Sequence, residues 1–274
     1  MENENGSRVM EYPTRQVDKL RAARDPLTPV DFLCRLYAED SIELNRSLAM
    51  NLSLPRDIVE GMMGHRTSAW LLLNPLLTFT QAQKIIRRAF WSTSKELKTC
   101  KTIIEMFDFL ICAEDEMLSN STRSESLSLL LRSPFVSTKE FRARAELYED
   151  CLSHMIIFAD ARYDVNSMDI TLVEDLEDFE GICQNINAST SLLAEVITFL
   201  QNSKENFSSA VYDNPQCPVR FSAPFFLATI DRHHWSPSRL QNFEPRLDQY
   251  INTVLGEGPW EDLPLLWKLK AIVE

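Results

Sequence analysis

Short apolar runs alternate along the chain with breaks that contain proline and asparagine or aspartate. Within the runs, apolar residues recur every three or four positions, which predicts amphipathic α-helices over residues 30–38, 56–63 and 80–90. Few segments show the strict alternation that is typical of a half-buried strand. The pattern therefore predicts an all-α fold.

The breaks contain similar residues in the same order. This order is DPLTP at 25–29, NLSLP at 51–55 and NPLLT at 74–78. The first proline stops the preceding helix, because it lacks an N–H donor and disfavours helical geometry in the residue before it. A second proline, or a threonine, then suits the first turn or the N-cap of the next helix.

The spacing of the breaks predicts a repeat array. Pro29 and Pro55 are 26 residues apart, and Asn51 and Asn74 are 23 residues apart. Fainter copies occur near Pro134 and in the Asn-Pro-x-x-Pro sequence that begins at 214. An internal period of this length is typical of solenoids, in which stacked units bury apolar faces that one unit cannot bury alone.

These units resemble the leucine-rich repeat variant, a bacterial repeat with an apolar run, an Asn-Pro step and a following Thr-Pro or similar step. The likeness is strongest at 25–77 and 210–231. It implies that each repeat pairs a short 3₁₀-like helix with an α-helix and that the repeats form a right-handed superhelix. The founding example of the family also carries a cysteine-ligated iron–sulfur module. The six cysteines here include no CxxC or CxxxxC pair, so we expect no cofactor.

We therefore expect an irregular, right-handed α-solenoid, similar to leucine-rich repeat variant and HEAT arrays, with a C-terminal helical cap. The expected organisation is a flexible tail at 1–13, N-terminal repeats at 14–151, an acidic interruption with a long helix at 152–205, and C-terminal repeats with the cap at 206–274. Only 6 glycines stand against 13 prolines. That ratio disfavours large β-sandwiches and Rossmann folds, which need glycine at turns and beside phosphates.

The net charge of −12, from 40 acidic and 28 basic residues, disfavours general binding to nucleic acid or to anionic membranes. The N-terminal residues are polar, and the most apolar windows, at 69–77 and 196–200, are too short to span a bilayer. Isolated cysteines in apolar runs favour reduced thiols in the protein interior. Together these features predict a cytoplasmic protein that does not contact a membrane.

Most of the negative charge lies in one segment. Residues 146–180 hold 11 acidic residues and one basic residue, Arg162. Such a segment forms either a solvated face or a docking surface for a basic protein, since charge of one sign steers encounter and selects partners. An EF-hand spacing is absent from it. The candidate partner-binding residues are Asp169, Glu174, Asp175, Glu177, Asp178 and Glu180. The predicted function is a non-catalytic protein-binding scaffold or adaptor.

Two other functions stay open. An enzyme would be centred on Asp231, His233 and His234, although adjacent histidines on a helix point about 100° apart and share no face. Motifs such as HExxH, GxSxG and Walker A are absent. Nucleic-acid engagement would use the basic stretch at 84–101, or an acidic surface that imitates DNA and binds a DNA-binding protein.

Overall fold

The computed structural model describes residues 12–65, 67–90, 95–113, 120–173, 175–203, 212, 214–230 and 237–273. Every regular element in these ranges is an α-helix or a 3₁₀ helix, which confirms the predicted all-α class for the described part of the chain. No helix in these ranges is long and apolar enough to cross a membrane.

Seven tight turns with the same backbone hydrogen bond separate the helices in the described ranges. In each, the carbonyl of the first residue accepts from the N–H three positions later; we call this first residue the turn residue. The turn residues are Asp25, Asn51, Asn74, Ser133, Asp160, Asn185 and Asn214. The residue four positions after each turn residue immediately precedes the next helix, and Thr78 and Ser137 form capping boxes there. Local chemistry therefore fixes where each helix begins.

The elements before the turns pack in a row. They are α1 (Gln16–Arg24), α3 (Ile42–Ala49), η1 (Ser68–Leu73), α8 (Asn120–Leu131), α10 (His154–Phe158) and α11 (Leu176–Gln184). Each contacts the next in this order, and η1 contacts α8 although three helices lie between them in the chain.

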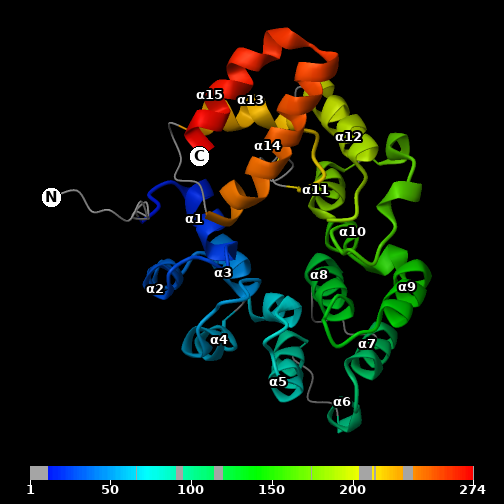
Figure 1. Ribbon diagram of the computed structural model, residues 1–274. Helices are drawn as coiled ribbons and strands as arrows, with labels where there is room; N and C mark the ends of the chain where they lie inside the picture. Colours follow the sequence, from blue (N-terminus) through cyan, green and yellow to red (C-terminus); the bar gives the residue numbers. More distant parts are fainter. Residues whose placement is uncertain are drawn as a thin grey trace, which may run out of the picture.

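The elements that directly follow the turns are α2 (Val30–Ala38), α4 (Arg56–Met62), α5 (Phe79–Ala89), α9 (Thr138–Leu147), η3 (Val165–Ser167), α12 (Thr190–Ser203) and α13 (Val219–Ile230). The remaining elements are α6 (Lys95–Thr99), α7 (Ile103–Cys112), η2 (Glu149–Cys151), η4 (Ile170–Leu172), α14 (Pro237–Glu257), η6 (Trp260–Asp262) and α15 (Leu263–Val273). Figure 1 shows the helices following one another along a curved path.

Buried asparagines link successive turns. The side-chain Nδ2 of Asn51, Asn74, Asn185 and Asn214 donates to two carbonyls of the preceding turn, at 2.7–3.1 Å. One carbonyl belongs to the preceding turn residue, and the other to the residue two positions before it. The Oδ1 atom accepts from the N–H two positions after the asparagine. Asparagine suits the position because it donates and accepts at once. We call these linked turns the asparagine ladder.

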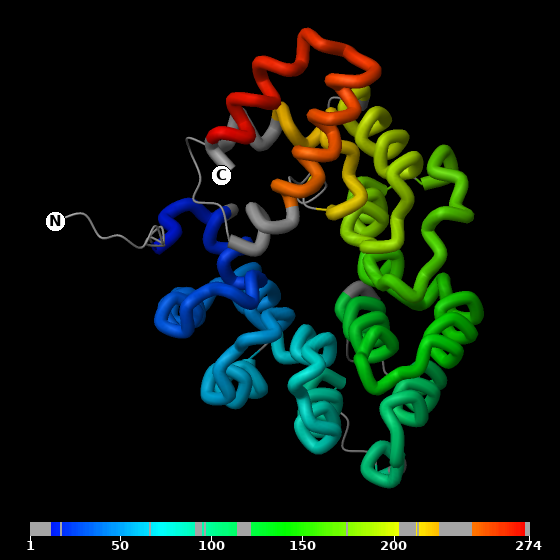
Figure 2. Tube along the Cα trace, in the orientation of Figure 1, coloured from blue at the N-terminus to red at the C-terminus, as the bar shows by residue number. Residues whose placement is uncertain are grey.

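Two hydrophobic cores follow from this arrangement. One continuous core extends from Ala22 to Cys217, through the row of elements before the turns. A second core is formed within α13, α14 and α15 and includes Phe243 and Leu269. Figure 2 shows the tube of α14 and α15, in orange and red, at the C-terminal end of the path.

Candidate interaction surface

The acidic segment 146–180 lies on the surface, from the end of α9 to α11. Most of its carboxylates are exposed: Glu146, Glu149, Asp150, Asp164, Asp169, Asp175 and Glu177. Within the described part of the chain, none of these seven forms an ion pair. Their charge therefore faces solvent without a basic partner among the described residues. We call these seven residues the acidic surface.

The six candidate partner-binding residues lie in different surroundings. Asp169, Asp175 and Glu177 are exposed. Asp178 and Glu180 lie on α11 and are half-buried, and Glu174 lies outside the described residues. The structure thus places three of the predicted carboxylates on the acidic surface.

The carboxylate of Asp169 is held in a fixed orientation at the start of η4. Its Oδ1 accepts from the Thr171 N–H at 3.0 Å and from the Thr171 hydroxyl at 2.7 Å. Both bonds lower the pKa of Asp169, and the bond from the hydroxyl has the larger effect. Asp169 therefore presents a permanent, oriented negative charge.

Asp178 has a different role, because it faces another helix. Its Oδ2 lies 3.5 Å from His154 Nδ1 on α10, and the His154 ring stacks on Phe158. Burial raises the pKa of Asp178, and the charge of a protonated His154 only partly offsets this effect. The pair joins α10 to α11 and contributes little to the acidic surface.

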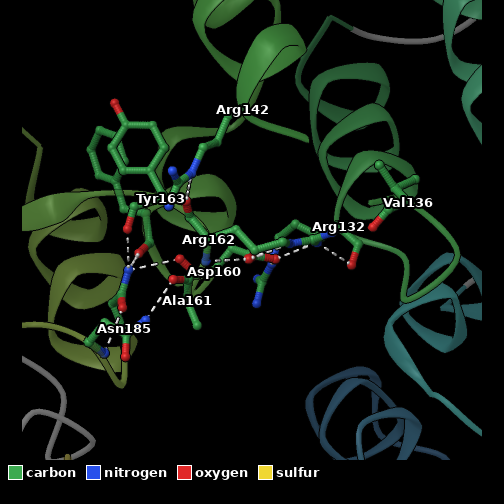
Figure 3. A network of polar contacts seen from close by, with 10 residues as sticks. Arg132, Val136, Arg142, Asp160, Ala161, Arg162, Tyr163 and Asn185 are labelled. Atoms are coloured by element: carbon green, nitrogen blue, oxygen red, sulfur yellow. Dashed lines mark hydrogen bonds and ion pairs between the residues drawn. The ribbon is translucent and has the colours of Figure 1, made fainter. Parts of the chain in front are cut away.

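Asp160 is buried, unlike the other described acids of the segment, and it completes a structural network (Figure 3). Its Oδ2 accepts from Arg132 at 3.1 Å and from Arg162 at 2.8 Å. Burial acts to raise the pKa of Asp160, but the hydrogen bond from Arg162 and the charge of Arg132 outweigh it and hold this pKa below its usual range.

Arg162 also continues the ladder where asparagine is missing. It donates to the carbonyls of Arg132 and Val136, at the turn that begins with Ser133. Aspartate at position 160 has no amide with which to reach that turn, so the arginine two positions later supplies the donors.

Beside the acidic surface lies a shallow, open hollow of about 430 Å³. It is formed by η4, by one face of α12 and by the start of α13. Its walls include Ile170, Thr171, Glu195, Thr198, Phe199 and Arg220. The Phe199 side chain is 45% exposed and stacks on the buried Phe179, with ring centroids 5.0 Å apart.

The other candidate sites gain no support. Asp231, His233 and His234 lie outside the described residues. In the described ranges no three His, Cys, Asp or Glu side chains lie close enough to hold a metal ion. In the basic stretch 84–101, Arg88 donates to the Met63 carbonyl at 2.8 Å, which is a structural contact.

Comparisons with protein-family models, with curated proteins and with solved structures find no match to this chain. The resemblance to the leucine-rich repeat variant therefore stays a prediction.

Sequence reasoning missed the hollow and the role of Arg162. Glu195 and Phe199 belong to a long helix whose apolar pattern indicates only its buried face. The sequence did contain a signal for the role of Arg162. It stands alone among the 11 acidic residues of 146–180, and any carboxylate of that segment that becomes buried needs a basic partner.

Proposed function

We propose that the protein is a non-catalytic scaffold that binds a partner protein through the acidic surface. The observation that carries this proposal is the group of seven exposed carboxylates without an ion pair in the described chain. A surface of one sign attracts a partner with a basic patch and raises the rate of encounter. The same surface suits a DNA-binding protein, since such proteins expose lysine and arginine to phosphates.

The arrangement of the helices supports the scaffold part of the proposal. Successive turns with the same hydrogen bonds, each followed by a helix, support an array of stacked helical units. That this array is a right-handed α-solenoid of leucine-rich repeat variant type is part of the proposal. A rigid array offers a broad surface at little cost in conformational entropy on binding.

The test is a charge reversal at two exposed carboxylates, Asp175→Lys with Glu177→Lys, in the full chain. Its matched control is Asp31→Lys with Asp57→Lys, which reverses two exposed acids in the first turns of α2 and α4. Because all four residues lie at or next to helix N-termini, the two double variants lose similar helix-dipole interactions.

Each tagged protein is used to capture partners from a lysate at low and at high salt, with quantitative mass spectrometry. We expect the wild type and the control variant to capture the same set of basic proteins at low salt. High salt should release these proteins, and the double variant at α11 should not capture them. Equal capture by the two double variants would contradict the proposal.

A further inference from the structure

The hollow beside the acidic surface presents apolar side chains to solvent from firmly held elements. Ile170 of η4 lines the hollow, is 6% exposed and packs into the core. Asp169 caps this turn. Phe199 is supported from behind by Phe179. The apolar wall is therefore formed before any partner arrives, which reduces the cost of ordering on binding.

Charge around the hollow is uneven. Glu195 lies in its wall, and Asp169 caps η4, whose Ile170 and Thr171 also line the hollow. Arg220 lies at the opposite side, on α13. A basic side chain is thus favoured beside η4 and disfavoured beside α13.

We propose that the hollow receives a large apolar side chain from a basic, amphipathic segment of a partner protein. In this arrangement Phe199 contacts the apolar side chain, and lysines or arginines on either side of it pair with Glu195 in the wall and with Asp169, which caps η4. The inference rests on the proposed function and names the chemistry of the partner at the same surface.

The physical argument combines size and complementarity. A volume of about 430 Å³ falls within the range of roughly 300–1,000 Å³ that is typical of ligand-binding pockets. Interfaces gain most of their affinity from a few apolar anchors in such hollows, while charged residues around them select the partner. Acidic residues alone would bind any basic chain; the hollow adds a preference for an apolar anchor.

The experiment uses two helical peptides of equal length and equal positive charge. One carries leucines at helical spacing among its lysines, and the other carries glutamines in their place. Affinities are measured by fluorescence anisotropy with the full chain, with Phe199→Ser, and with Phe135→Ser as the matched control. Phe135 is 42% exposed, packs edge-on against Phe79 and does not line the hollow.

We expect the leucine peptide to bind the wild type at least about tenfold more tightly than the glutamine peptide, since burying one leucine contributes about 1.5–3 kcal/mol. Phe199→Ser should remove most of this difference and leave the glutamine peptide unchanged, whereas Phe135→Ser should change neither. Arg220→Glu should strengthen the binding of both peptides.

Two outcomes overturn the inference in distinguishable ways. If both peptides bind the wild type equally, or if Phe199→Ser and Phe135→Ser behave alike, the hollow is not the anchor site and the acidic surface alone binds. If neither peptide binds at low salt, the proposed function fails with it.

Discussion

At the residue scale, a single side-chain amide joins each of four turns to the turn before it. Asn185 is fully buried, and its Nδ2 donates to the carbonyls of Phe158, Asp160 and Tyr163. An aspartate at this position would place a second oxygen against these carbonyls. It would leave several buried acceptors without a donor and add an uncompensated charge.

We therefore expect Asn185→Asp to lower the free energy of unfolding by about 3 kcal/mol. The control is Asn187→Asp in the same turn, whose exposed amide donates to the Ala161 carbonyl; its loss should cost about 1 kcal/mol or less. Denaturant titrations followed by circular dichroism measure both. A similar loss in the two variants would mean that the ladder contributes nothing beyond ordinary surface hydrogen bonds.

At the element scale, the short helices before the turns approach one another closely. Gly181 on α11 faces the backbone of α10, and a Cβ atom at position 181 would lie 2.5 Å from the Met155 carbonyl oxygen. Real Cβ atoms do not approach a backbone oxygen so closely, so a side chain there must push the two helices apart.

Gly181→Ala should destabilise the protein by about 1–3 kcal/mol, the usual cost of overpacking. Gly256→Ala in α14 is the opposite case, because a Cβ there meets nothing within 4 Å. It should stabilise the protein by about 0.5–1 kcal/mol, since alanine favours helix more than glycine does. Thermal unfolding of both variants checks the sign of each change, and a neutral Gly181→Ala would show that α10 and α11 can separate without cost.

At the scale of the whole molecule, one arginine connects the two cores. Arg246 on α14 donates to the carbonyls of Asn214 and Cys217, in the last turn of the ladder. In other turns an asparagine donates to the carbonyl of the turn residue, as Arg246 does at Asn214. Arg162 donates to the carbonyl three positions after the turn residue, as Arg246 does at Cys217. The unit formed by α13, α14 and α15 thus docks on the first core by continuing its hydrogen-bond scheme.

Arg246→Met should expose α13–α15 to solvent more often while leaving α1–α12 protected. The matched control is Arg142→Met, which also removes a guanidinium bond to a carbonyl but lies on the exposed surface of α9, far along the chain from α13–α15. Hydrogen exchange with mass spectrometry should show faster exchange confined to α13–α15 in Arg246→Met alone. Uniformly faster exchange along the chain would indicate that the two cores unfold together.

The sequence predicts the helical class and several turns, because proline and hydroxyl residues punctuate the chain locally. It does not predict the turns at Asp160 and Asn185, where alanine and isoleucine replace the proline. Proline is favoured after the turn residue but is not required there, whereas the bond to the preceding turn depends on residues about 25 positions away. The acidic surface is visible in the sequence; the hollow depends on tertiary packing and is not.

The asparagine ladder also has a direction. Every amide donates toward the N-terminal side, so the C-terminal end of any such series presents carbonyl oxygens that need a donor. A second molecule approaching that end would offer the turn at Asp25, whose side chain has no amide and whose Oδ1 already accepts from the Leu27 N–H. Arg246 already donates to two carbonyls of the last described turn. The ladder of one copy therefore gains no asparagine bond from the first turn of another.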